Sequence, residues 1–335
     1  VLPLLGVGGM QLYKAEIPGP LKDAKLKPRI TETAKTLWLI YLTITVLCAL
    51  FYRFFGMSTY DAICHAFSTV SIGGFSTHDE SFGFFEQTSI RLTCMVFMVI
   101  AGINFALHYI SWHKKRLLHY FYDSEVRAYL GLLFGLFIIT SLTLYVYFPT
   151  ESFTWSIKEG AFQVISITTT TGFLTSNYAN WPLFVPILLL TASFIGACAG
   201  STGGGIKVIR SLVLFKHGGS EITKLIHPNA IVSIKLGKKA VDSRVVESIW
   251  GFLSIYVLVF IIILLLMLSQ GNDFLTSFSA VGATLNNMGP GLGEVAQNYS
   301  SLTDLSKIGL CLAMILGRLE IFTLLVILTP SFWRN

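Results

Sequence analysis

The amino-acid sequence predicts an all-α membrane protein that repeats a unit of spanning helix, short re-entrant segment and second spanning helix. Composition is the first observation: of 335 residues, 53% are hydrophobic and 13% are charged, which is too apolar for a soluble domain of this size. The second observation is a pattern that occurs three times. At 64–77, 161–176 and 278–293 an amphipathic stretch too short to cross a bilayer runs into a glycine-containing segment, and a long apolar stretch follows.

Six stretches are long and apolar enough to cross a bilayer. They lie near 36–52, 90–111, 129–148, 183–214, 249–268 and 308–328. Residues 1–13 are also apolar but have neither the basic start nor the cleavage site of a signal peptide, so we interpret them as the end of another helix.

Pairing the spans around the three short segments divides the chain into units. We assign 1–35 to the end of a first unit's last helix and its cytoplasmic linker, 36–126 to a second unit, 127–242 to a third unit with a cytoplasmic linker, and 243–335 to a fourth. Each unit crosses twice, so all have the same orientation. A pseudo-fourfold ring, as in potassium channels, needs four units. We therefore expect most of the first repeat to lie upstream of Val1.

Charge predicts the topology. The net charge of +6 is concentrated in loops around 14–35, 114–127 and 216–244, which the positive-inside rule places in the cytoplasm. The three short segments then enter from the periplasmic side. The basic loops lack interleaved aromatic residues, which argues against nucleic-acid binding. The five cysteines occur singly in apolar segments, so the sequence supports neither a disulfide framework nor a zinc site.

The three glycine-containing segments share an order of residues, polar side chains followed by glycine. We align Gly73, Gly172 and Gly289. The candidate filter residues are Val70, Ser71, Ile72 and Gly73 in the first segment, Thr169, Thr170, Thr171 and Gly172 in the second, and Asn286, Asn287, Met288 and Gly289 in the third. Main-chain carbonyl groups can replace the water shell of a monovalent cation, and glycine permits the backbone angles that this requires. No carboxylate occurs in the segments, which disfavours divalent cations.

An alternative for each segment is a close-packing surface or an extracellular loop, since Ser, Thr and Gly are common in both. A single copy would favour that interpretation. Three copies at equivalent places favour a filter.

The second spanning stretch of the middle unit is interrupted by the glycine-rich sequence GACAGSTGGGIK at 196–207. Glycine costs about 1 kcal/mol relative to alanine in a helix, so the helix must open here. A flexible segment next to a re-entrant loop is suited to gating. The candidate gate residues are Gly196, Gly200, Ser201, Thr202, Gly203, Gly204, Gly205, Lys207 and Arg318. A glycine-rich packing seam is an alternative, and a phosphate-binding loop is a weaker one because Val208 replaces the required hydroxyl.

Arg318 lies inside the last apolar stretch, where a charge costs about 2.5–3.5 kcal/mol on insertion scales. It should therefore face water, protein or a partner. Facing the pore, it would repel a cation about 7 Å away by about 2 kcal/mol at an effective dielectric constant of about 20. Alternatively, it could bond the open carbonyl groups of 196–205. Glu320 lies on another face of the helix, so the two should not pair.

The sequences STVSIGGFST, SITTTTGF, LNNMGPGLG, GACAGSTGGGIKVIR and GRLEIFTLLVILTPSFW closely resemble the membrane subunits of bacterial Trk potassium uptake systems, in the Trk/Ktr/HKT superfamily. The resemblance covers nearly the whole chain. It implies four M1–pore–M2 repeats, potassium as the transported ion with no organic cofactor, carbonyl coordination at the three segments, an intramembrane loop as gate, and a basic residue at the position of Arg318. It also implies a homodimer in the bacterial inner membrane, seated on a cytosolic ring of nucleotide-binding, TrkA-like regulatory subunits.

The expected function is gated potassium uptake across the inner membrane, through a carbonyl-lined filter controlled by the intramembrane loop and a buried Arg318. A proton- or sodium-coupled potassium symporter is the alternative, although His65, His108 and Glu320 are almost the only titratable residues that the spans offer for it. The chain has no clustered Ser/His/Asp, metal-ligand or cofactor motif, so we do not expect an enzyme.

Overall fold

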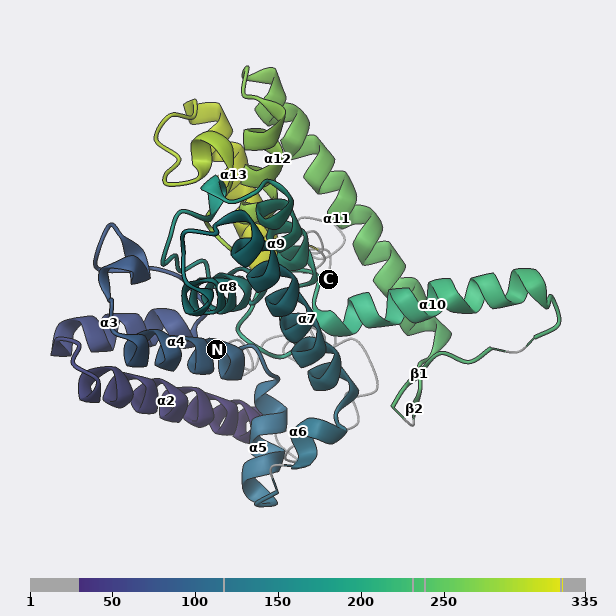
Figure 1. Ribbon diagram of the computed structural model, residues 1–335. Coiled ribbons are helices and arrows are strands. Elements are labelled where there is room, and N and C mark those ends of the chain that lie inside the picture. Colours follow the sequence, from purple (N-terminus) through teal and green to yellow (C-terminus); the bar gives the residue numbers. More distant parts are fainter. Residues whose placement is uncertain (1–29, 117, 231, 238, 320, 322–335) are drawn as a thin grey trace.

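The computed structural model describes residues 30–319 and 321, except 117, 231 and 238, and shows a bundle of helices (Figure 1). The helices are α2 (Ile30–Phe54), α3 (Thr59–Val70), α4 (Thr88–Ala101), α5 (Phe105–His113), α6 (Leu118–Tyr122), α7 (Ser124–Tyr147), α8 (Phe153–Thr168), α9 (Phe184–Ile195), α10 (Val208–Ile226), α11 (Ser243–Ser269), α12 (Phe274–Leu285) and α13 (Asp304–Arg318), with short 3₁₀ turns at Ser81–Phe84, Tyr178–Asn180 and Gly293–Val295. Two two-residue strands, β1 (Lys235–Leu236) and β2 (Lys239–Ala240), pair antiparallel. The helical class predicted from the sequence is confirmed.

The helices pack in three groups of three: α2, α3 and α4; α7, α8 and α9; and α11, α12 and α13. Neighbouring groups meet where α4 packs on α8 and where α9 packs on α12. The middle member of each group is short. Helices α3, α8 and α12 have 12, 16 and 12 residues, which at 1.5 Å per residue is less than the thickness of a bilayer core.

Each short helix begins at a polar side chain that caps its first turn. The capping oxygens belong to Ser58, Ser152 and Asp273, and each accepts a hydrogen bond from the main-chain N–H three residues later. At α12, the hydroxyl and N–H of Thr276 both bond Asp273, and they hold the pKa of this carboxyl below its usual range. The beginnings of the short helices are therefore built alike.

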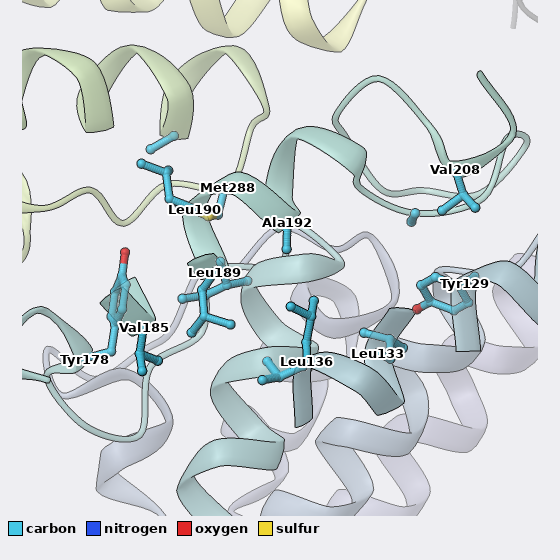
Figure 2. Packing of buried hydrophobic residues seen from close by; sticks show 14 of the residues in the cluster. Tyr129, Leu133, Leu136, Tyr178, Val185, Leu189, Leu190, Ala192, Val208 and Met288 are labelled. Carbon is cyan, nitrogen blue, oxygen red and sulfur yellow. The ribbon is translucent and has the colours of Figure 1, made fainter. Parts of the chain in front are cut away.

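The largest buried cluster joins the middle group to the third one. Figure 2 shows Leu133 and Leu136 of α7 beside Leu189 of α9, with Met288 at the far side of the same cluster. Met288 belongs to the third candidate filter segment and is 2% exposed. This segment is therefore anchored in the hydrophobic core of the group next to it.

Three described helices are long and apolar enough to cross a membrane: Glu32–Phe54, Ser124–Tyr147 and Ser243–Ser269. The pair α4 and α5 would make a fourth if it counts as one bent span. Of the stretch predicted at 308–328, the residues up to Arg318 belong to α13, and residues 319 and 321 are also described. The remaining residues of this stretch lie outside the described part of the chain.

The stretch predicted as one span at 90–111 is broken, which corrects the sequence interpretation. Helices α4 and α5 meet at 93°. A Cβ atom at Gly102 would overlap the hydroxyl of Tyr129, and the side chain of Asn104 starts the new helix by accepting from the N–H of Ala106 at 2.8 Å. Apart from Asn104, the residues at the break are apolar or glycine, so hydropathy does not reveal it.

The predicted interruption at 196–207 is confirmed. Helix α9 ends at Ile195 and α10 begins at Val208. Helix α10 continues to Ile226, well beyond the predicted end of the span at 214, and projects from the bundle in Figure 1.

Close packing at the α4–α5 break gives a test. We expect Gly102→Ala to lower the free energy of unfolding by about 1–3 kcal/mol, because the added methyl group must displace Tyr129. Thermal unfolding of the detergent-solubilised protein measures this. The control is Gly135→Ala in α7, where no described atom lies within 4 Å of the new methyl group. Equal midpoints for the two variants would contradict the packing described here.

Candidate functional site

The three short helices end in the same turn. Their C-capping residues Ser71, Thr169 and Asn286 have φ/ψ angles of −75°/−7°, −72°/−10° and −81°/−7°. Two residues further on, an N–H donates back to the helix over 2.8 Å in all three cases: Gly73 to Ser68, Thr171 to Ser166, and Met288 to Ala283. The three turns are therefore equivalent.

The residue after each cap adopts a left-handed conformation. Ile72, Thr170 and Asn287 have φ of 56°, 67° and 56°. This region is unfavourable for residues with a Cβ atom, and it is rare for a β-branched residue such as isoleucine. Strain of this kind persists only where the surrounding structure enforces it, and it gathers at functional sites.

A second left-handed residue follows two positions later in each turn, and it is always glycine: Gly74, Gly172 and Gly289, with φ of 70°, 82° and 95°. The equivalent of Gly172 in the first segment is therefore Gly74. The alignment on Gly73 was one residue out of register, because two adjacent glycines cannot be told apart by sequence. Val70 is correspondingly the last residue of α3 and matches Thr168.

The hand of the backbone alternates along each turn, because Gly73, Thr171 and Met288 lie between the two left-handed residues and are not themselves left-handed. Such alternation turns successive peptide planes the same way, so N–H groups gather on one side and carbonyl groups on the other. The N–H groups bond back to the short helices. Within the described part of the chain, no hydrogen-bond donor reaches the carbonyl groups of these three middle residues.

A cavity of about 550 Å³ lies against all three turns. Its lining includes Ser71, Ile72, Gly73, Gly74, Thr171, Gly172, Asn287, Met288 and Gly289, together with Tyr299, Lys307 and Arg318. None of the described residues that line it is Asp or Glu. Because the three turns border it and no carboxylate of the described residues does, the cavity suits a monovalent cation better than a divalent one.

Neighbouring turns approach so closely that only glycine fits. A Cβ atom at Gly74 would overlap the carbonyl oxygen of Thr171, and one at Gly172 would overlap the carbonyl oxygen of Met288. The turns are thus ordered first, second, third. At Gly289 no described atom lies within 4 Å of the Cβ position, so the third turn has an open side where the first two have a neighbour.

The side chain of Asn286 is buried and already engaged. Its Oδ1 accepts from the hydroxyl of Tyr256 at 2.5 Å, and its Nδ2 donates to Ser193 Oγ at 3.0 Å. These contacts fix the third turn to α11 and α9. The side chain therefore supports the turn from behind and does not line the cavity.

The glycine-rich segment 196–207 contacts the ends of all three short helices. Thr202 Oγ1 donates to the carbonyl of Val70 at 2.8 Å, and the N–H of Gly204 donates to Thr170 Oγ1 at 2.7 Å. A Cβ atom at Gly204 would overlap the carbonyl oxygen of Asn286. The segment is packed directly against the filter candidates.

The other gate candidates shape this segment. Left-handed conformations occur at Gly196, Gly200, Gly205 and Lys207. The hydroxyl of Ser201 and the ammonium of Lys207 donate within the segment, to the carbonyl groups of Cys198 and Gly203.

The segment is also tied to the α4–α5 break. The N–H of Cys198 donates to the carbonyl of Gly102, and the N–H of Phe105 donates to that of Gly200, both over 3.0 Å. The two interrupted helices thus satisfy each other's main chain.

Arg318 is placed at the end of α13, where it lines the cavity and donates from Nη1 to the carbonyl of Thr202 at 3.0 Å. The sequence interpretation described it as buried, whereas it is exposed. The hydrogen bond to 196–205 raised as an alternative is present, and the same side chain also faces the cavity. Glu320 lies outside the described residues.

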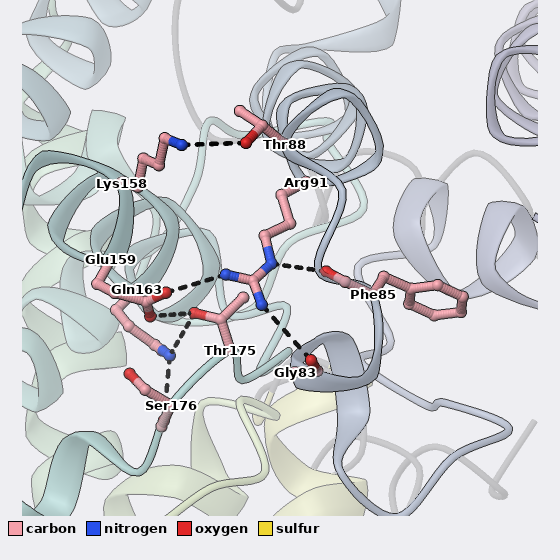
Figure 3. A network of polar contacts seen from close by, with 9 residues as sticks. All are labelled: Gly83, Phe85, Thr88, Arg91, Lys158, Glu159, Gln163, Thr175 and Ser176. Atoms are coloured by element: carbon pink, nitrogen blue, oxygen red, sulfur yellow. Dashed lines mark hydrogen bonds and ion pairs between the residues drawn. The ribbon is translucent and has the colours of Figure 1, made fainter. Parts of the chain in front are cut away.

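A polar network braces the second short helix, as Figure 3 shows. Arg91 of α4 pairs with Glu159 of α8 at 3.0 Å, and Glu159 accepts from the hydroxyl of Thr175 at 2.6 Å. Gln163 donates to Thr175 and to the carbonyl of Ser176. The network joins the chain entering the second turn to the chain leaving it. The sequence reasoning missed it, although the charge of Arg91 at the start of a predicted span was a usable signal.

Three equivalent non-helical turns that border one cavity, inside a bundle of apolar helices, are typical of a membrane protein for the passage of cations. The family model of the TrkH cation transport proteins matches residues 1–334, and the chain belongs to this family. The resemblance noted from the sequence motifs is thereby confirmed.

The proteins to which this chain is similar support the family assignment. Over 335 residues the chain is 52% identical to the Trk system potassium uptake protein TrkH of Escherichia coli K12, covering all of this chain and 69% of that protein. It is 43% identical to TrkG of the same organism, with the same coverage. The crystal structure of the potassium transporter TrkH from Vibrio parahaemolyticus matches with a TM-score of 0.88 at 48% identity, over 94% of this chain and 68% of that one.

The network of Figure 3 gives a stability prediction. Arg91→Ala leaves Glu159 buried without its cation, which typically costs about 3–5 kcal/mol for a buried pair. We expect the lower end, because the Arg91 side chain is 21% exposed. Thermal unfolding in detergent measures the loss.

The control for this network is Lys158→Ala, which removes an exposed hydrogen bond to Thr88 and should change stability by less than about 0.5 kcal/mol. A double variant, Arg91→Met with Glu159→Gln, should recover part of the stability lost in Arg91→Ala. A single variant as stable as the control would show that the pair does not brace α8.

Proposed function

We propose that the chain conducts potassium across the bacterial inner membrane as the membrane component of a Trk uptake system. The relatives described above are named as Trk potassium uptake proteins. The observation that carries the proposal is the repeated alternation of backbone hand in three equivalent turns around one cavity. Potassium is the substrate, and we assign the chain neither an organic cofactor nor a catalytic reaction.

In this proposal the carbonyl groups of the three turns replace the water around the ion. The proposed coordinating residues are 71–74, 169–172 and 286–289, so the first segment is shifted by one residue from the prediction and no longer includes Val70. Carbonyl coordination explains why the side chains at equivalent positions differ as widely as Ile72, Thr170 and Asn287 do. The hydrogen bonds that hold Asn286 and Thr170 then serve to keep the carbonyl groups in place.

We further propose that the three helix groups are units of a pseudo-fourfold ring, with units at 36–126, 127–242 and 243–335 and with 1–35 ending the first. The distance from each turn to its neighbour supports a ring with a fourth position. Gly74 and Gly172 each face a carbonyl of the next turn, whereas Gly289 faces open space that a fourth turn would fill. The cavity on this side is lined by the first turn and by Leu310 and Met314 of α13.

The segment 196–207 is proposed as the gate. It bonds the ends of the short helices, and its glycines allow a backbone that does not fit a helix. Arg318 holds the segment through Thr202 and places a positive charge at the cavity. One side chain would thus combine the electrostatic barrier and the structural contact.

The turns are proposed to face the periplasm, and the basic loops the cytoplasm. A homodimer seated on a cytosolic TrkA-like nucleotide-binding ring remains a proposal. The name Trk system, which implies several components, supports a regulatory partner. The exposed apolar residues Phe215, Ile222 and Leu225 of the projecting helix α10 support a protein contact there.

Proton- or sodium-coupled symport is the second candidate, and the two histidines of the membrane segments speak against proton coupling. His65 is fully buried and bonds the carbonyl of Asp61 and the hydroxyl of Ser76. His108 bonds Tyr120 and the carbonyl of Ile100. Neither histidine lines the cavity, so neither is placed to exchange protons with the pathway.

Rubidium uptake into liposomes that contain the full-length protein tests the function. A channel takes up rubidium under a membrane potential alone, without a proton or sodium gradient, and prefers potassium and rubidium to sodium. Gly172→Ala, whose methyl group would overlap the carbonyl of Met288, should abolish this preference or the flux itself. Uptake that strictly requires a proton or sodium gradient would favour the symporter.

The gate proposal predicts that Arg318→Ala raises basal potassium flux per folded protein. Removing a barrier of about 2 kcal/mol corresponds to an increase of up to roughly thirtyfold. Arg318→Lys should stay close to wild type, because it keeps the charge. The control is Lys158→Ala, which removes a positive charge that does not line this cavity and that bonds Thr88, and it should match wild type.

Deleting Gly203 and Gly204 should likewise raise basal flux, since it shortens the gate segment.

If Arg318→Ala only reduces the yield of folded protein while flux per molecule stays constant, the arginine is structural and not a barrier.

A further inference from the structure

Glu125 is a buried carboxylate that the proposed pathway does not use. It lies in the first turn of α7, and 3% of its surface is exposed. Its Oε1 accepts two main-chain hydrogen bonds from outside its own helix, from the N–H of Ala199 at 2.7 Å and from the N–H of Ile209 at 3.2 Å. One oxygen atom therefore joins the gate segment to the first turn of α10.

Helix α10 depends on this contact because its own sequence does not cap it. The capping position is Lys207, which is left-handed and gives no side-chain hydrogen bond to the first turn. The first N–H groups of a helix have no partner within the helix, and an anion is favourable there. Glu125 supplies both the acceptor and the negative charge from a neighbouring helix.

The contact with Ala199 lies within the part of the segment that reaches the turns. Cys198, the residue before, is held by Gly102, and Thr202, three residues after, bonds Val70 and accepts from Arg318. Glu125 and Arg318 thus hold the segment from α7 and from α13. Of the two, only Glu125 also bonds α10.

We infer that Glu125 is a positioning residue of the gate, whose carboxylate couples the start of α10 to the segment 196–207. A displacement of α10 then pulls the segment away from the ends of the short helices, and loss of the carboxylate releases it. This inference rests on the proposed role of the segment as the gate.

The experiment compares Glu125→Ala and Glu125→Gln in the full-length protein in liposomes. Glu125→Ala removes the acceptor and should raise basal potassium flux per folded protein about tenfold, while the preference for rubidium over sodium stays as in wild type. Glu125→Gln keeps an acceptor oxygen without the charge and should give a smaller rise. Glu221→Ala, an exposed residue of the same helix α10 that pairs with Lys224, is the matched control and should match wild type.

The native thiol of Cys198 provides a second measurement, which reports release of the segment itself, whereas the unchanged preference for rubidium over sodium shows that the turns stay intact. It is fully buried, next to Ala199, whose N–H donates to Glu125. Labelling with a water-soluble maleimide, quantified on the peptide that contains Cys198, should become about tenfold faster in Glu125→Ala and faster to a lesser degree in Glu125→Gln. If Glu125→Ala does not fold, both measurements are made on Glu125→Gln.

The inference is overturned if folded Glu125 variants show wild-type flux and wild-type labelling of Cys198. Failure of the proposed gate can be distinguished from failure of the inference about Glu125. If deletion of Gly203 and Gly204 raises basal flux and the Glu125 variants do not, only the coupling role of Glu125 is wrong. If the deletion also leaves flux unchanged, the segment is not the gate.

Discussion

Each main-chain polar group at membrane depth must bond within the protein or face water, because lipid offers no partner. This constraint explains why the non-helical parts of the chain meet in one place. The turns return N–H groups to the short helices, whereas the carbonyl groups of Gly73, Thr171 and Met288 receive no donor from the described residues. The glycine-rich segment and the α4–α5 break have no helical partners at these points, so they bond each other and the helix ends.

The same bonds that satisfy the main chain also connect the parts mechanically. The segment contacts Val70 and Thr170, at the ends of two short helices, and it is held by side chains from α7 and α13. It cannot leave this position without breaking hydrogen bonds at both its filter side and its anchoring side. In the proposed gating role, the segment would leave this position only if a movement elsewhere, such as one of α10, compensated for the lost bonds.

Much of this architecture was predictable because residue composition and hydrophobic periodicity are local properties of the sequence. Apolar length identified the long helices, and glycine content identified the break after Ile195. The α4–α5 break was missed because the group that leaves no room for a side chain at Gly102, the hydroxyl of Tyr129, is distant in the sequence. The register at Gly74 depends on φ angles, and the roles of Glu125 and Glu159 depend on partners more than 60 residues away. Long-range pairing of this kind leaves no local pattern in a single sequence.

Anomalous diffraction from crystals of the full-length protein grown in rubidium tests most directly whether the carbonyl groups of the turns hold the ion. Rubidium replaces potassium and can be located independently of the protein atoms. Peaks should lie on the cavity side of the turns at 72–74, 170–172 and 287–289, coordinated by main-chain oxygen atoms and stopping short of the segment 196–207. Rubidium bound only by side chains elsewhere, or none at the turns, would contradict a carbonyl filter.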